Sequence, residues 1–200
     1  MAGLIALAGG YLAGSLPSAI LAGRLLGIDV VRSGSGNPGA SNVARLAGLL
    51  PAAGVFAADA GKTLAAVMVA SIWGEWAAAS AAVGVVVGHA WPPWPGIRGG
   101  RGLGEILVGG LVVTTVPTLA MVGFLAAGVF TRRLGLFALV GMAAYPGFTV
   151  LWGDPPGIAF AAASLVLNVA RRLHGSAHRS GAGLRAAWRD RLLYDREPVT

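Results

Sequence analysis

The stretch ILVGGLVVTTVPTLAMVGFLAAGVFT, residues 106–131, carries no charged side chain over its whole length. Residues 1–23 and 134–153 are also free of charge. A helix that spans a bilayer needs roughly 17–25 apolar residues, so stretches of this length predict a polytopic membrane protein. The composition agrees, because 56% of the 200 residues are hydrophobic and 12% are charged, whereas a soluble domain averages about 25% charged residues.

The N-terminal apolar stretch is predicted to stay in the protein as its first transmembrane helix, from about residue 3 to residue 26. A cleaved signal peptide is the alternative. That reading is weaker, because no basic residue precedes the apolar part and GSLPSAI, residues 14–20, continues the helix without a clear cleavage site. The next crossings are expected at residues 44–74 and from Trp76 to Trp91.

Arginine residues in the loops set the expected orientation. Cytoplasmic loops collect Lys and Arg. The loop with Arg32 and Arg45, the loop with Arg98 and Arg101, and the basic tail are therefore placed on one side. An even number of crossings must then follow the second loop.

This parity divides residues 106–131 into two short crossings at Pro117. The predicted fold class is an all-α membrane bundle of about seven short transmembrane helices, with the N-terminus outside and the C-terminus in the cytoplasm. A five-crossing layout keeps the same parity. Residues 1–176 are read as one membrane-embedded domain.

Residues 177–200 are read as a basic cytoplasmic tail. Leu184, Trp188 and Leu192 recur at a spacing that gives a helix one apolar face, which is typical of a helix lying on a membrane surface. A solvated basic tail is an equally good reading. The net charge of +7 suits a membrane surface at least as well as nucleic acid, and no nucleic-acid partner is expected.

No metal site is expected. The chain has no cysteine and three histidines, which excludes thiolate sites and leaves few nitrogen ligands.

A polar loop, RSGSGNPGASNVAR at residues 32–45, interrupts the apolar chain. Glycines let successive backbone N–H groups point into one concavity, which favours an anion. The planar guanidinium group of arginine suits phosphate. A tight turn with arginines that only set the topology is the alternative, and this loop alone does not decide between them.

A second loop, GIRGGRGLGE at residues 96–105, repeats this composition at the start of a presumed helix. The N-terminus of a helix offers free N–H groups and a partial positive charge, which favour phosphate. Two such loops on one face indicate a protein that handles a phosphorylated molecule beside lipid.

Between the loops, DAGKT at residues 59–63 lacks the upstream glycine of a nucleotide P-loop, so nucleotide binding is not expected. Asp59 and Lys62 are three residues apart and share a helix face. An ionisable pair at membrane depth faces a polar cavity or a partner, so both a functional pair and a structural ion pair stay open. His89 is expected to be structural rather than catalytic.

These segments also carry a resemblance. The motifs GSLPSAILAGRLLGIDV, GSGNPGASNVAR, DAGK, GHAWPPWPGIRGGRG and NVARRLHGS occur in the order and approximate spacing of a known family. The chain resembles the bacterial acyl-phosphate:glycerol-3-phosphate acyltransferases, the PlsY family, from about residue 14 to residue 176.

The resemblance implies an enzyme that moves a fatty acyl group from acyl phosphate to the sn-1 hydroxyl of glycerol 3-phosphate. Its products are lysophosphatidic acid and phosphate, and no cofactor is needed. It also implies a multi-pass protein of the bacterial plasma membrane whose active site faces the cytoplasm. In the family the substrate phosphate is thought to take the hydroxyl proton.

The residues expected to serve the reaction lie in the loops and in the last helix. The expected catalytic residues are Ser35, Arg45, Lys62 and Arg101. The expected substrate-binding residues are Gly34, Gly36, Asn37, Asn42, Arg98, Gly99, Gly100, Gly102, Asn168 and Arg171.

The chain departs from the family pattern at several of these places. Arg101 replaces the usual lysine, Glu105 replaces the usual threonine, and Leu165 and Ala177 replace a histidine and a glutamate. A divergent enzyme with another acceptor, a non-catalytic membrane subunit and an organic-anion transporter therefore stay as alternatives. The absence of internal repeats disfavours the transporter.

Overall fold

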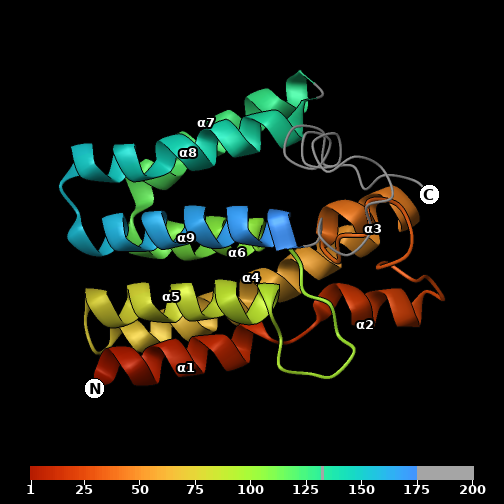
Figure 1. Ribbon diagram of the computed structural model, residues 1–200, viewed down its shortest axis with the longest axis horizontal. Helices are drawn as coiled ribbons and strands as arrows, with labels where there is room; N and C mark the ends of the chain where they lie inside the picture. Colours follow the sequence, from red (N-terminus) through yellow and green to blue (C-terminus); the bar gives the residue numbers. More distant parts are fainter. Residues whose placement is uncertain (132, 175–200) are drawn as a thin grey trace. The chain divides into compact units, whose positions relative to one another are not determined.

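The computed structural model describes residues 1–131 and 133–174, with only the backbone described at His174. These residues form helices and no strand. The helices are α1 Ala2–Gly14, α2 Ser18–Leu25, α3 Ala40–Ala47, α4 Leu49–Ser71, α5 Glu75–Ala90, α6 Leu103–Val113, α7 Thr115–Phe130, α8 Leu134–Trp152 and α9 Pro155–His174 (Figure 1). The chain divides into two compact units, the first from Met1 to Val113 and the second from Thr114 onward.

The expected first helix is broken in two. The helix α1 ends at Gly14 and α2 begins at Ser18, because Pro17 has no N–H group and its ring disfavours helical backbone at the residue before it. The break frees backbone carbonyl groups in an apolar region, where each needs a partner. The Ser15 carbonyl accepts from Trp94 Nε1 at 2.9 Å, and the Leu16 carbonyl accepts from Lys62 Nζ at 3.0 Å.

In the first unit, α1 packs closely along α5 (Figure 1). Glycines four residues apart on each helix make this approach possible. A Cβ atom at Gly14 would lie 2.1 Å from the Val85 carbonyl oxygen, and one at Gly88 would lie 2.0 Å from that of Tyr11. Small residues at such spacing let membrane helices pack backbone to backbone. The helix α4 packs against α1, α5 and α6.

Residues 106–131 form two helices with a break at Thr114 rather than at Pro117, and two membrane crossings there stay a prediction. Pro117 instead occupies the first turn of α7, where its missing N–H group leaves no intrahelical bond unmade. In the second unit, α8 packs against both α7 and α9. Tyr145 anchors this packing through a hydrogen bond of 2.7 Å with Thr118 and an edge-on contact with Phe160.

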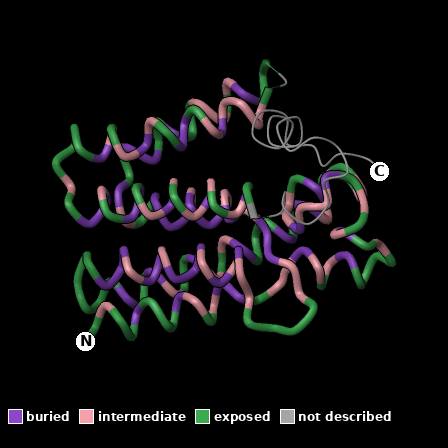
Figure 2. Tube along the Cα trace, viewed as in Figure 1, coloured by how far each residue is buried: buried purple, intermediate pink, exposed green. Residues whose placement is uncertain are grey.

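Among the residues that the structure describes, three helical spans are long and apolar enough to cross a membrane: Ala2–Leu25, Leu49–Ser71 and Leu134–Trp152. The helices α6 and α7 are shorter and apolar. Along the helices buried and exposed stretches alternate (Figure 2), and many exposed positions carry large apolar side chains such as Leu4, Leu12 and Met68. A lipid environment accepts such outward-facing apolar side chains, so the chain is an integral membrane protein.

Candidate functional site

The first polar loop is held from inside by the side chain of Asn42. This residue is 1% exposed and lies in the first turn of α3. Its Oδ1 accepts from the Ser35 backbone N–H at 2.8 Å, and its Nδ2 donates to the Val30 and Ser33 carbonyl groups at 2.9 and 3.0 Å. The amide therefore organises the loop, while a direct contact of Asn42 with substrate stays a prediction.

Two glycines give the loop its shape. Gly34 and Gly36 have φ angles of +62° and +67°, in the left-handed region that other residues rarely adopt. Ser35 between them is buried, and its Oγ accepts from the Asn37 backbone N–H at 3.4 Å. The N–H groups of Ser35 and Gly36 donate to Asn42 Oδ1 and to the Ser33 carbonyl, so the expected anion-binding nest stays a prediction.

The second loop touches the first. The Gly100 N–H donates to the His89 carbonyl at 3.1 Å, which ties the loop to the end of α5. A Cβ atom at Gly100 would lie 2.8 Å from the Pro38 carbonyl oxygen and 2.3 Å from His89 Nε2. Gly102, with φ +72°, then turns the chain into α6. The two loops that the sequence singled out for anion binding therefore meet.

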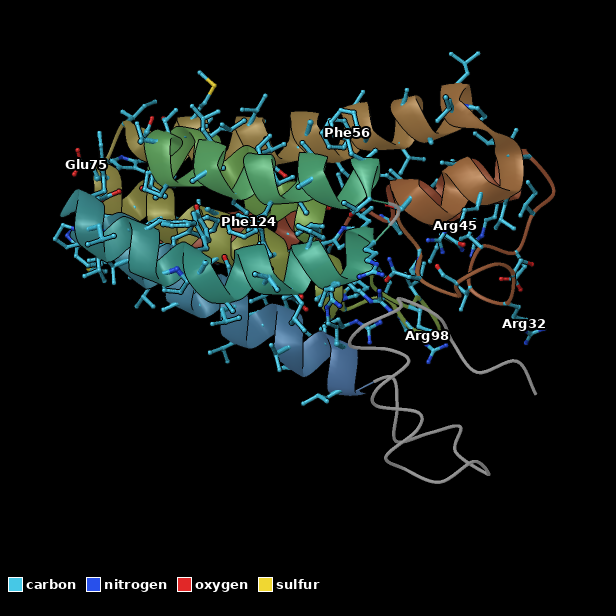
Figure 3. All side chains as sticks on the ribbon, turned by 90° about the horizontal axis from the view of Figure 1, so that it is seen from above. Arg32, Arg45, Phe56, Glu75, Arg98 and Phe124 are labelled. Carbon is cyan, nitrogen blue, oxygen red and sulfur yellow. The ribbon has the colours of Figure 1, made fainter. Side chains whose placement is uncertain are left out.

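Arginine side chains gather at this end of the first unit. Figure 3 shows Arg32, Arg45 and Arg98 around the loops, while Glu75 lies at the opposite end. Within residues 1–131 and 133–174, no hydrogen bond or ion pair holds the side chains of Arg45 and Arg98, which leaves their charge available to a ligand. Arg101 is half-buried at the start of α6.

An open pocket of about 490 Å³ lies between the flanks of the two loops. Three arginines line it, Arg24, Arg32 and Arg98, together with Asp29. Arg32 Nε is 3.7 Å from Asp29 Oδ2, and both side chains are largely exposed. Three cations against one carboxylate leave the pocket with excess positive charge, which attracts phosphate-bearing molecules.

Lys62 lies in a buried cluster with Asp59, His89 and Glu105. The expected shared face of Asp59 and Lys62 is confirmed, with Nζ 2.7 Å from Asp59 Oδ1. The same Nζ lies 3.5 Å from Glu105 Oε1 and 3.4 Å from His89 Nδ1. With the Leu16 carbonyl, the two carboxylates occupy the three donors of the ammonium group. The contacts of Lys62 are therefore structural, and its predicted catalytic role stays a prediction.

Glu105 stood only as a departure from the family pattern, outside the expected site residues, and His89 was expected to be structural. Glu105 lies in the first turn of α6, is 2% exposed, and its Oε1 contacts His89 Nδ1 on α5. The available signal was a carboxylate at the edge of an apolar run, where an uncompensated charge is costly and needs a partner. Local spacing cannot name that partner, because it belongs to another helix.

The oxygen and nitrogen atoms of Asp59, His89 and Glu105 come within 4.8 Å of one another, a spacing that could hold a metal ion. Lys62 Nζ already lies against both carboxylates, however. The resident ammonium group supplies the cation that these carboxylates need. We therefore read the cluster as an ion network rather than a metal centre.

The remaining expected site residues belong to the second unit. Asn168 is buried in α9, and its Oδ1 accepts from Arg172 Nε at 2.9 Å. Arg171 is half-buried on the same helix. The substrate-binding roles of Asn168 and Arg171 stay predictions, and Ala177 and the predicted tail lie outside the described residues.

The model of one protein family, glycerol-3-phosphate acyltransferase, matches residues 4–180 of the chain. The chain belongs to this family. A glycerol-3-phosphate acyltransferase of Sinorhizobium fredii is 40% identical over 148 residues, which cover 72% of this chain and 71% of that protein. Those of a Synechococcus strain and of Prochlorococcus marinus are 35% and 37% identical and cover 90% and 89% of this chain, and 96% and 95% of their own lengths.

Two crystal structures of PlsY, an integral membrane glycerol 3-phosphate acyltransferase, share the family fold with this chain. Its glycerol 3-phosphate form superposes with a TM-score of 0.78 and its lysophosphatidic acid form with 0.75. Both are 26% identical to the chain and cover 90% of it, and the chain covers 96% of each. The resemblance drawn from the sequence motifs is thereby confirmed.

Proposed function

We propose that this chain transfers a fatty acyl group from acyl phosphate to the sn-1 hydroxyl of glycerol 3-phosphate. The products are lysophosphatidic acid and inorganic phosphate. The meeting of the two glycine-rich loops at Pro38 and Gly100 carries the proposal, because it supports one site able to hold two phosphate groups. Membership of the acyltransferase family supports the reaction type.

The loops contribute charge and hydrogen-bond donors. Arg45 and Arg98 bind the substrate phosphates, and Arg101 acts where the family usually has lysine. The Ser35 hydroxyl and the guanidinium groups of these arginines stabilise the negative charge that develops on the acyl carbonyl and the leaving phosphate. Holding the hydroxyl beside the carbonyl supplies a further large part of the acceleration.

In this proposal Lys62 acts indirectly, through the helices that it holds together. Its ammonium group joins Asp59 of α4 and Glu105 of α6 and caps the Leu16 carbonyl at the α1–α2 break. It thereby fixes the helices that carry the loops.

The protein is proposed to cross the bacterial plasma membrane about seven times, with its active site at the cytoplasmic face. The arginines that gather around the two loops of the first unit support this orientation (Figure 3). Acyl phosphate, whose chain lies in the bilayer, and glycerol 3-phosphate, which comes from the cytoplasm, meet at this face.

Release of phosphate from palmitoyl phosphate by the purified protein in liposomes tests the proposal. Wild-type protein is expected to release phosphate only when glycerol 3-phosphate is present. The Arg45→Ala variant is expected to lose most of this release, whereas Arg133→Ala, an exposed arginine of the second unit, keeps it. Folded wild-type protein without glycerol-3-phosphate-dependent release would contradict the proposal.

A different acceptor is the second candidate, favoured by Arg101, Leu165 and Ala177 at positions where the family usually has other residues. The same assay with other phosphorylated polyols separates the two. Release that follows another acceptor more strongly than glycerol 3-phosphate would assign the chain to that acceptor.

A further inference from the structure

His89 and Glu105 form a buried pair beside the loops. The Nδ1 atom of His89 contacts Oε1 of Glu105, and the two side chains are 10% and 3% exposed. Lys62 Nζ lies 3.4 Å from the same Nδ1 and balances one of the two negative charges of Asp59 and Glu105. All three helices that surround the pair, α4, α5 and α6, therefore contribute to fixing the imidazole ring.

The opposite ring nitrogen is unused. Among residues 1–131 and 133–174, Nε2 of His89 has no hydrogen-bond partner. Nε2 faces the second loop, because a Cβ atom at Gly100 would lie 2.3 Å from it. His89 also lines a narrow pocket with Arg98, Gly99, Gly100, Pro38 and the residues of the α1–α2 break.

That pocket holds about 10 Å³, which admits one water-sized group. A hydroxyl group has this size. Arg98 also lines the larger pocket with Arg24 and Arg32, the arginine pocket, so the two pockets adjoin the same side chain. A phosphorylated polyol with its phosphate in the arginine pocket can thus direct a hydroxyl toward His89.

The chemistry of the pair follows from its contacts. An ionised carboxylate only accepts hydrogen bonds, so the Glu105 contact places a proton on Nδ1 of His89. The neutral ring then keeps its lone pair on Nε2, the nitrogen beside the pocket. A carboxylate that holds one ring nitrogen and stabilises the imidazolium is the arrangement that makes histidine an effective general base.

We propose that His89, oriented by Glu105, is the general base for the acceptor hydroxyl. This inference rests on the proposed acyltransferase function. The hydroxyl proton passes to Nε2 while the hydroxyl oxygen forms a bond to the acyl carbonyl carbon of acyl phosphate. The bond between that carbon and the phosphate oxygen breaks, and the imidazolium returns the proton to the leaving phosphate.

This route differs from the one that the family resemblance implies, in which substrate phosphate takes the proton. Glu105 marks the difference, because the family usually has threonine at this position. A threonine hydroxyl cannot supply the negative charge that stabilises an imidazolium. The carboxylate in this chain therefore gives His89 a capacity that the usual pattern lacks.

Kinetics of acyl transfer to glycerol 3-phosphate by His89→Gln, His89→Ala and Glu105→Gln in liposomes test the proposal. Removal of a general base is expected to lower kcat by about 10²- to 10⁴-fold in both His89 variants, with the KM for glycerol 3-phosphate little changed. Added imidazole is expected to restore part of the rate in His89→Ala. The Glu105→Gln variant is expected to lose less than the His89 variants. His178→Ala serves as the matched histidine control.

A wild-type kcat in His89→Gln would overturn the proposal, and so would a loss confined to KM. If both His89 variants unfold, Glu105→Gln decides, since its kcat then either falls at unchanged KM or stays at the wild-type value and overturns the proposal. Failure here is distinct from failure of the proposed function, which would abolish glycerol-3-phosphate-dependent transfer in the wild-type protein itself.

Discussion

At the scale of single residues, the first loop depends on one amide and one glycine. The Asn42 side chain bonds three backbone groups of the loop. Gly34 has no side chain, which leaves the space that Asn42 Oδ1 occupies. The loop shape is thus fixed before any substrate arrives. Such preorganisation lets the charged and polar side chains of the loop stabilise developing charge without reorganising during the reaction.

Replacement of Gly34 by alanine is expected to abolish most activity. The new Cβ atom would lie 2.3 Å from Asn42 Oδ1 and would displace the amide, in addition to the strain of a φ angle of +62°. Gly27→Ala is the matched control, because Gly27 has φ +69° with open space around its Cβ position. The control is expected to lose only about 1–2 kcal/mol of unfolding free energy from left-handed strain. Equal activities of the two variants would contradict this account.

At the scale of helices, the first unit is held by two devices. The first is the close packing of α1 on α5, where Gly10 and Gly14 face Ala81 and Val85. The second is the ion network of Asp59, Lys62, His89 and Glu105, which joins α4, α5 and α6. Both devices hold helices of the first unit that precede or follow the loops in the chain.

Gly10→Leu is expected to lower the thermal unfolding temperature in detergent and to reduce activity. Its Cβ atom would lie 2.2 Å from the Ala81 carbonyl oxygen, so α1 must move away from α5. The adjacent Gly9→Leu serves as control, since nothing lies within 4 Å of its Cβ position. Leucine favours a helix over glycine at both positions, so a lower unfolding temperature at Gly9 as well would refute the packing argument.

Lys62→Met is expected to destabilise the first unit by about 3–5 kcal/mol, because removing one partner leaves buried carboxylates uncompensated. The double variant Asp59→Asn/Lys62→Met removes one of those carboxylates and is expected to recover part of the loss. Thermal unfolding in detergent measures both. A double variant less stable than Lys62→Met would show that the network is not balanced by charge.

At the scale of the whole molecule, the protein is expected to place its loops in the cytoplasm and the α4–α5 turn outside. The chain has no cysteine, so single introduced cysteines report topology cleanly. A membrane-impermeant maleimide should label Glu75→Cys in intact cells and Ser41→Cys only after lysis. The reverse pattern would contradict the proposed orientation.

The sequence predicted much of this architecture, and its failures have physical causes. Absence of charge identified the apolar helices, and arginine placement predicted that residues 106–131 divide, three residues after the observed break at Thr114. The break at Pro17 was missed because the motif around it reads as a continuous apolar run. The pairing of His89 with Glu105 was missed because residues on different helices meet only through tertiary packing, which local spacing does not encode.

The central claim is acyl transfer to glycerol 3-phosphate, and direct detection of the product tests it best. Purified protein in liposomes would receive palmitoyl phosphate and radiolabelled glycerol 3-phosphate, with lipid product and phosphate measured together. The account predicts sn-1 lysophosphatidic acid in equal amount to the phosphate released. Phosphate without labelled lipid, or no phosphate from folded protein, would contradict it.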